Sequence, residues 1–265
     1  MIQNTNNRQI GASTIAVILT ILVIALAGYL VYKVQVLEAR VKQVETIVSG
    51  ANPQAQAEKP LEIAQIKALF KKGNVAFGDA KSKVLFVEFA DPSCPYCHAG
   101  AYGADEIFQG QFKTVADGGK YRPPVQEMKK LVDEGKASYV WLFANGHGNG
   151  ELTSQAFYCA NDQGKFWEAH GLLYSKVGYD LINNDVKNDK ANAPKLAEYL
   201  STVLDGTLLQ SCLDSGKYAN KIGEDMQTAQ SLGFQGTPMF IVNTKRFAGA
   251  INYADMEADV NAALK

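Results

Sequence analysis

Two cysteines separated by two residues are the most reactive feature of this 265-residue sequence. Cys94 and Cys97 enclose Pro95 and Tyr96, and they follow an apolar, β-branched run at residues 84–89 that predicts a buried strand. The segment after Cys94 can be helical, with Pro95 in its first turn. A cysteine at a helix N-terminus meets free backbone N–H groups and the helix dipole, which favour its thiolate. The pattern therefore predicts dithiol–disulfide exchange, with Cys94 as the nucleophile and Cys97 as the resolving thiol.

Metal binding is the alternative chemistry for such a pair. No second CxxC is present, and His98, His147 and His170 do not have the spacing of a zinc motif. The position at a strand-to-helix junction favours the redox interpretation. His98 follows the pair directly, where it either stabilises the thiolate or is an ordinary solvated helix residue.

Glu88 interrupts the apolar strand six residues before Cys94. In a central strand, both faces are covered and a lone carboxyl group is buried at a cost, so it is protonated or bonded to a partner. In an edge strand, the same carboxyl group faces water. The first arrangement predicts that Glu88 is buried beneath the cysteine turn.

The N-terminal part of the chain predicts a membrane anchor. After a tail at residues 1–10, residues 11–32 contain no charged side chain, and a helix of this length measures about 33 Å, enough to cross a bilayer. A cleaved signal peptide is the alternative, because residues 25–27 resemble an A-x-A site. The flanking charges do not decide the orientation. The net charge of −1 gives no reason to expect a nucleic-acid partner.

Residues 33–60 are predicted to form a stalk helix followed by a polar linker. Apolar residues recur there at steps of four and three, at positions 30, 34, 37, 41, 44 and 48. This seam fits a short coiled coil that joins two protomers, or a single amphipathic helix.

Residues 61–265 are predicted to form an α/β domain. Strands are expected at 75–77, 83–90 and 137–144 and helices at 61–72, 95 to about 112, and 123–134, with a loop at 114–122. An all-helical insert follows over about 151–215, with a segment at 178–190 that reads as turns. A helix at 218–232, a β-hairpin at 239–250 and a helix from about residue 253 complete the chain.

These elements and four motifs resemble the thioredoxin superfamily and, within it, the DsbA-like thiol:disulfide oxidoreductases. The resemblance covers roughly residues 61–265, as a thioredoxin-like fold with a helical insertion. Its motifs are VEFADPSCPYC at 87–97, NDQGKFWEAH at 161–170, CLDSGK at 212–217 and GFQGTPMF at 233–240. The stretch NGHGNGEL at 145–152 departs from the pattern of these proteins.

The resemblance implies roles for several residues and needs no cofactor or metal. Glu88 would act as a proton relay for Cys97. Thr237 and Pro238 would form a cis-proline loop whose backbone pairs with an extended substrate. Pro95 and Tyr96 would contact substrate and tune the redox potential.

The second cysteine pair, Cys159 and Cys212, lies on two predicted helices of the insert. In an oxidising compartment such a pair is expected to form a structural disulfide, whereas in a reducing one both would be buried free thiols. A dithiol oxidase requires the same compartment, which predicts that the domain is extracytoplasmic.

The sequence thus predicts an enzyme that introduces disulfides into reduced, exported proteins. The resemblance implies reoxidation by a DsbB-like or VKOR-like membrane protein. A reductase or isomerase of the same fold, or a CxxC metal-binding module, is the alternative.

Overall fold

The computed structural model describes residues 16–17, 22, 26–38 and 60–265. The chain divides into two units, Met1–Glu58 and Lys59–Lys265. In the first unit, residues 26–38 are helical, and most of the predicted anchor at 11–32 and of the predicted stalk and linker at 33–60 lies outside the described residues. Within the described ranges, no helix combines the length and the apolar character needed to span a bilayer.

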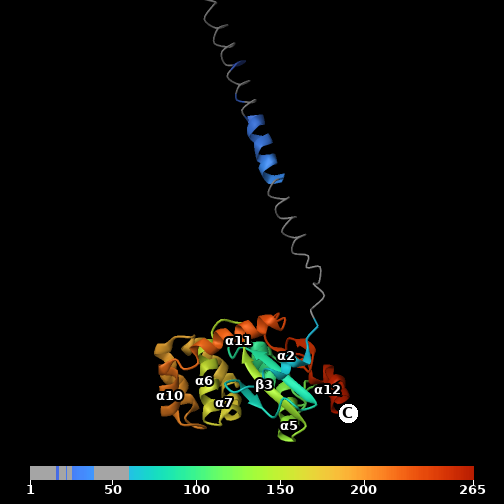
Figure 1. Ribbon diagram of the computed structural model, residues 1–265. Helices are drawn as coiled ribbons and strands as arrows, with labels where there is room; N and C mark the ends of the chain where they lie inside the picture. The colour runs from blue at the N-terminus through green and yellow to red at the C-terminus, as the bar shows by residue number, and fades with distance from the viewer. Residues whose placement is uncertain (1–15, 18–21, 23–25, 39–59) are drawn as a thin grey trace, which may run out of the picture. The chain divides into compact units, whose positions relative to one another are not determined.

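A mixed five-stranded sheet forms the centre of residues 60–265 (Figure 1). Its order is β1-β3-β2-β4-β5, and only β2 and β3 run parallel to each other. The strands are β1 (Val75–Phe77), β2 (Val84–Ala90), β3 (Ala137–Phe143), β4 (Met239–Val242) and β5 (Lys245–Ala248). The predicted α/β fold, including the edge strand and the C-terminal hairpin, is confirmed.

Strand β2 is central and buried at every position. Alternate side chains point to opposite faces of a strand, so Phe86, Glu88 and Ala90 share one face while Val87 and Phe89 share the other. Phe86 and Ala90 belong to the hydrophobic cluster that also contains both cysteines of the CxxC pair. The pattern of β2 therefore turns Glu88 toward the reactive side of the sheet.

Helices cover both faces of the sheet. Helices α2 (Ile63–Lys67) and α11 (Ala219–Ser231) contribute to the cluster on the face of Val87 and Phe89. Helices α3 (Pro95–Tyr102), α5 (Pro124–Asp133) and α12 (Glu257–Leu264) pack on the other face. A 3-10 turn, η3 (Tyr253–Asp255), precedes α12.

The helical insert lies between β3 and α11, and its helices α6, α7 and α10 gather together in Figure 1. Its elements are α6 (Glu151–Asp162), α7 (Phe166–Leu173), α8 (Lys176–Asp180), η1 (Leu181–Val186), η2 (Lys190–Asn192), α9 (Ala193–Leu200) and α10 (Gly206–Ser215). The prediction of turns over 178–190 is wrong in its first part, because η1 is a π-helix that buries Ile182 and Val186. Burial of these two apolar side chains favours a helix here, although most residues over 178–190 are polar.

The helix after the cysteines is shorter than predicted. Helix α3 ends at Tyr102, and the short helix α4 (Asp105–Phe108) follows. Gly103 separates them with φ of 77°, and a side chain there would lie 2.5 Å from the Thr114 methyl group. The loop that contains Thr114 therefore ends the helix, and the chain turns back toward the cysteines.

Candidate active site

Cys94 occupies the N-cap of α3, with Pro95 in the first turn. Its backbone N–H donates to Asp91 O at 2.9 Å, and its carbonyl accepts the Cys97 N–H at 3.0 Å. The Cys94 residue is 4% exposed and Cys97 is fully buried, and neither is disulfide-bonded. The structure is therefore that of the reduced dithiol.

The two thiols are held in different protonation states. The Cys97 side chain is the main cause that lowers the Cys94 pKa to about 6. Burial raises this pKa, whereas the Thr237 side chain and backbone N–H groups of the first helical turn lower it further. Burial, followed by the neighbouring Cys94, raises the pKa of Cys97 well above its ordinary value. At neutral pH, Cys94 is therefore mainly a thiolate and Cys97 a thiol.

The loop before β4 places Thr237 beside the nucleophile. The Thr237–Pro238 peptide bond is cis, and Cys94 Sγ lies 3.6 Å from the Thr237 carbonyl oxygen, which accepts a hydrogen bond when Cys94 is protonated. Gly100 allows α3 to approach this loop closely, since a Cβ there would lie 3.4 Å from Pro238 Cγ and 3.1 Å from Phe240 Cζ. The Thr237 backbone is thus next to the sulfur that a substrate must reach.

Glu88 is fully buried in the central strand, so the edge-strand alternative is wrong. Tyr139 donates a hydrogen bond to Glu88 Oε2, whereas Oε1 has no protein partner among the described residues. Burial raises the pKa of Glu88 to about 7, although the Tyr139 hydrogen bond lowers it. The Glu88 charge contributes to the raised pKa of Cys97. A carboxyl group with this pKa can both give and take a proton at neutral pH.

Neither prediction for His98 is correct. The residue is fully buried, not solvated, and its Nε2 lies 2.7 Å from the Pro92 carbonyl oxygen. Burial lowers its pKa to about 4, so the imidazole is neutral and adds no positive charge near Cys94. Among the residues that the structure describes, no group of three or more His, Cys, Asp or Glu side chains is placed to hold a metal ion.

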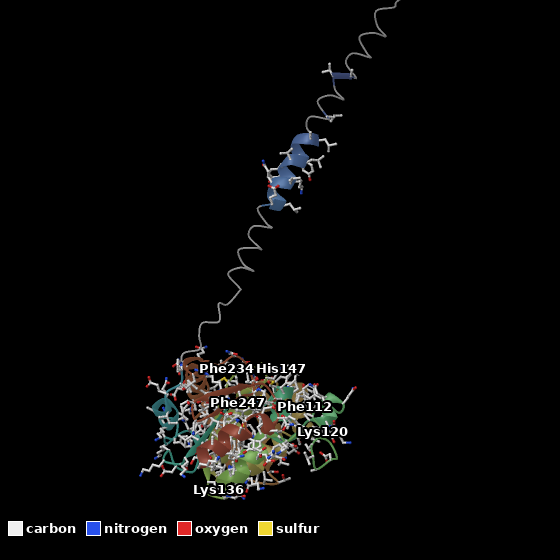
Figure 2. All side chains as sticks on the ribbon, turned by 90° about the vertical axis from the view of Figure 1, so that its right-hand side faces the viewer. Phe112, Lys120, Lys136, His147, Phe234 and Phe247 are labelled. Atoms are coloured by element: carbon white, nitrogen blue, oxygen red, sulfur yellow. A yellow bond between two sulfur atoms is a disulfide. The ribbon has the colours of Figure 1, made fainter. Side chains whose placement is uncertain are left out.

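Tyr96 borders a shallow hollow beside Cys94. Its side chain is 46% exposed, and its ring packs on Phe108 and Phe112 with centroid separations of 4.9 and 6.2 Å. The hollow, of about 390 Å³, is lined by Tyr96, Gln111, Phe112, Thr237, Ala248, Gly249, Ala250 and Ile251. Figure 2 labels Phe112 among the side chains of this unit. An extended chain that reaches Cys94 would meet this apolar wall.

The insert contains the second cysteine pair in bonded form. A disulfide joins Cys159 of α6 to Cys212 of α10, with Cα atoms 6.1 Å apart. It lies away from the CxxC turn in sequence and fastens two helices of the insert to each other.

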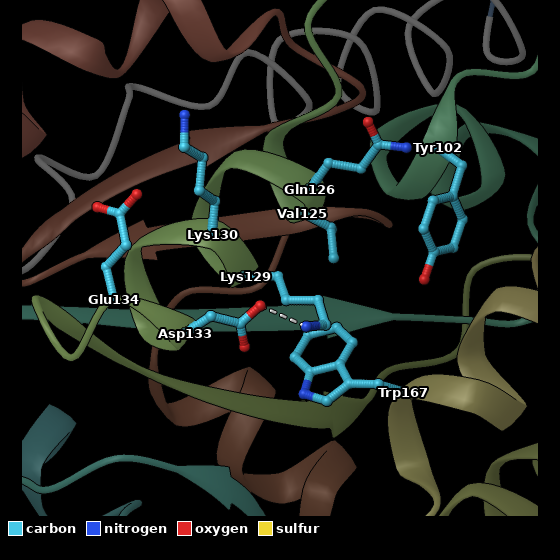
Figure 3. A pocket seen from close by; sticks show the side chains of 8 residues that line it. All are labelled: Tyr102, Val125, Gln126, Lys129, Lys130, Asp133, Glu134 and Trp167. Atoms are coloured by element: carbon cyan, nitrogen blue, oxygen red, sulfur yellow. Dashed lines mark hydrogen bonds and ion pairs between the residues drawn. The ribbon is translucent and has the colours of Figure 1, made fainter.

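Another hollow, of about 320 Å³, lies between α5 and α7 (Figure 3). It is lined by Tyr102, Val125, Gln126, Lys129, Lys130, Asp133, Glu134 and Trp167, and Lys129 pairs with Asp133 at 2.6 Å. Neither cysteine of the CxxC pair lines it, so it does not belong to the redox site.

Asp91 is a buried site residue that the sequence did not indicate. It is fully buried, and its carboxylate accepts hydrogen bonds from the backbone N–H groups of Gly146, His147 and Gly148. These belong to the glycine-rich stretch that departs from the family pattern. Asp91 and the glycine-rich stretch are both visible in the sequence, but they are more than fifty residues apart. No local pattern therefore indicates that they contact each other.

Comparison with known proteins identifies the family. A family model described as thioredoxin matches residues 124–262, just over half of the chain. The chain belongs to the thioredoxin family. The match begins after the CPYC turn and does not include the cysteine pair.

Two curated relatives of this thioredoxin-family chain differ in how much of their own length it covers. A Na(+)/H(+) antiporter NhaA 3 of Salinispora tropica is 30% identical over 189 residues, which are 70% of this chain but 24% of the antiporter. This chain therefore spans about a quarter of that relative. Disulfide bond formation protein D of Bacillus subtilis is 24% identical over 201 residues, with 73% of this chain and 78% of the relative covered.

Solved structures share the fold. BdbD of Bacillus subtilis aligns with a TM-score of 0.55 at 22% identity, over 73% of this chain and 94% of the other. The α-DsbA1 protein of Wolbachia pipientis aligns with a TM-score of 0.52 at 17% identity, over 73% of this chain and 92% of the other. The resemblance to DsbA-like proteins is confirmed.

Proposed function

We propose that this chain is a thiol:disulfide oxidoreductase that introduces disulfides into exported proteins. The observation that carries the proposal is the unequal cysteine pair, with the pKa of Cys94 lowered to about 6 at a helix N-terminus and Cys97 buried behind it. The relative named disulfide bond formation protein D supports the direction of the reaction.

The reaction begins from the oxidised pair. A substrate thiolate attacks Cys94 Sγ, the Cys94–Cys97 bond breaks, and Cys97 leaves with the electron pair. Because the pKa of Cys97 is high, its sulfur takes up a proton, and Glu88 is the buried acid able to supply it. A second substrate thiolate then attacks the substrate sulfur of the mixed disulfide and releases Cys94 as a thiolate. The substrate has lost two electrons and the enzyme has gained them.

The lowered pKa of Cys94 sets the direction. A stable thiolate stabilises the reduced enzyme relative to its disulfide and makes Cys94 a good leaving group. Both effects favour oxidation of substrate over its reduction. This is the physical reason for choosing the oxidase over a reductase or isomerase of the same fold.

The enzyme needs a partner that removes the two electrons, and we propose a DsbB-like or VKOR-like membrane protein. Membranes that contain such a protein should restore the Cys94–Cys97 disulfide of the reduced enzyme, and membranes without it should not. If neither type of reoxidant accepts electrons, this part of the proposal is wrong.

Pairing of two protomers through residues 33–60 stays a prediction.

We further propose that residues 11–32 anchor the chain in the cell membrane, with the catalytic domain outside the cytoplasm. The Cys159–Cys212 disulfide supports this location, because cytosolic thiols are kept reduced. Protease added to intact bacterial spheroplasts that express the full chain is expected to digest the domain. Complete protection of the domain until the membrane is lysed would refute the proposed orientation.

A peptide with two cysteines tests the enzymatic activity. The oxidised enzyme should convert the reduced peptide to its disulfide, and Cys94→Ser should abolish the reaction. Cys97→Ser cannot form the Cys94–Cys97 disulfide, so it should not oxidise the reduced peptide. With the disulfide form of the peptide, its Cys94 thiolate should form a mixed disulfide and release one peptide thiol, and Cys97 is not there to resolve that bond. Peptide oxidation by Cys94→Ser at the wild-type rate would exclude the mechanism.

A further inference from the structure

Asp91 is a buried carboxylate surrounded by hydrogen-bond donors. Its Oδ2 accepts the backbone N–H groups of Gly146, His147 and Gly148 at 2.9, 2.7 and 3.4 Å. Its Oδ1 accepts the N–H and the hydroxyl of Ser93 at 2.8 and 2.6 Å. Figure 2 labels His147 on this loop. A buried carboxylate with this many donors is fixed in place, and it fixes the loop at residues 145–150 in return.

The backbone of Asp91 contacts both reactive cysteines. Its N–H donates to Cys97 Sγ at 3.4 Å, and its carbonyl accepts the Cys94 N–H at 2.9 Å. The same residue therefore bonds the CxxC turn through its main chain and the loop through its side chain.

The loop in turn packs against Thr237. A methyl group at Gly146 would overlap the Thr237 hydroxyl oxygen and lie 3.0 Å from its Cβ. Gly150 is equally close to Asp91, because a methyl group there would overlap Asp91 Oδ1. Glycine at both positions thus permits a continuous contact from the carboxylate, through the loop, to Thr237.

We infer that Asp91 is a positioning residue, whose carboxylate holds loop 145–150 against Thr237 and so fixes the Thr237 backbone and side chain at the Cys94 sulfur. The inference rests on the proposed function, since Thr237 is the backbone on which an extended substrate would dock. It also gives a role to the stretch in which this chain departs from the family pattern.

Replacing the carboxylate should release the loop. In Asp91→Asn, an NH₂ group replaces one of the two carboxylate oxygens. Because NH₂ only donates hydrogen bonds, the backbone N–H groups that bonded to the replaced oxygen lose their acceptor. The Thr237 side chain lowers the Cys94 pKa, so its displacement should raise that pKa by roughly half to one unit. Displacement of the Thr237 backbone, on which the peptide would dock, should raise the KM by roughly threefold to tenfold. A purely structural role would lower the melting temperature without these changes at the site.

Gly146→Ala tests the same contact from the other side and keeps Asp91 intact. Its methyl group should displace Thr237 and raise both the Cys94 pKa and the KM. In a Thr237→Ala background, the overlapping oxygen is gone, so adding Gly146→Ala should have a much smaller effect. Gly223→Ala on α11 is the matched control, because a methyl group there meets nothing within 4 Å and should change neither quantity.

The thiolate absorbance of Cys97→Ser variants gives the Cys94 pKa, and peptide oxidation by the full chain gives kcat and KM. Equal effects of Gly146→Ala in both backgrounds, or unchanged pKa and KM in folded Asp91→Asn, would overturn the inference. The pKa measurement needs no substrate, so it separates the two proposals. A shifted Cys94 pKa without peptide oxidation by the wild type would support the positioning role and reject the proposed function.

Discussion

Glu88 destabilises the folded protein when its carboxyl group is charged, so the free energy of unfolding depends on pH. Its pKa rises from an ordinary 4.5 to about 7, so the folded chain holds this proton more tightly than the unfolded chain. Protonated Glu88 therefore stabilises the folded state fully below about pH 4.5, and this stabilisation is lost as the pH rises through about 7. Glu88→Gln has no charge to bury, so it should be more stable than the wild type at pH 8, by on the order of 3 kcal/mol.

Urea unfolding of both reduced proteins at pH 4 and pH 8 checks this prediction, and the difference should nearly vanish at pH 4. The same variant should slow formation and reduction of the Cys94–Cys97 disulfide near neutral pH, because it cannot exchange a proton with Cys97. A stability difference that is equal at both pH values, with unchanged exchange rates, would remove Glu88 from the site chemistry.

Residues whose chemistry depends on their near neighbours in sequence were predictable. The CxxC turn, the buried carboxyl in its strand and the Thr-Pro loop each had a local pattern. Asp91 and His98 did not, because their environments come from distant parts of the chain. The partners of Asp91 are backbone N–H groups, which leave no side-chain signature, and His98 is buried by rings of Tyr174 and Tyr179 in the insert.

At the scale of elements, the disulfide between α6 and α10 closes a loop of 53 residues. In the chain-entropy model, closing a loop of this length stabilises the folded state by about 4 kcal/mol. The double variant Cys159→Ala with Cys212→Ala should lose about that much free energy of unfolding in urea, while its Cys94 pKa stays near that of the wild type. A loss below about 1 kcal/mol would show that packing of α6 on α10 alone holds the insert together.

Elements with a clear period and a clear end were predicted well, as β2, β3 and α5 demonstrate. The end of α3 was missed because it depends on Gly103 meeting Thr114, a contact made only after the 114–122 loop has folded back. The π-helix η1 was missed because two buried residues in a polar segment give too short a pattern to distinguish from turns.

At the scale of the whole molecule, the order of strands and helices predicted a thioredoxin-like fold through its resemblance to that superfamily, and the structure supplies the order of the sheet. A strand, a crossover with α3 and α5, and a second strand form the parallel pair β2–β3, and the final hairpin adds β4 beside β2. This pairing brings the loop at Thr237 next to Cys94, although 143 residues separate them. The fold therefore brings the site residues together, and the chemistry of the site depends on how strongly this environment stabilises the Cys94 thiolate.

The redox potential of the Cys94–Cys97 pair tests this account most directly. It is measured by equilibrating the full chain with glutathione mixtures, while thiolate absorbance of Cys97→Ser gives the Cys94 pKa. A thiolate stabilised at the start of α3 predicts a Cys94 pKa near 6 and a potential more oxidising than the roughly −270 mV of thioredoxin. A pair that equilibrates at or below the thioredoxin value, with Cys94 titrating like a free cysteine near about 8.5, would contradict the oxidase and favour a reductase.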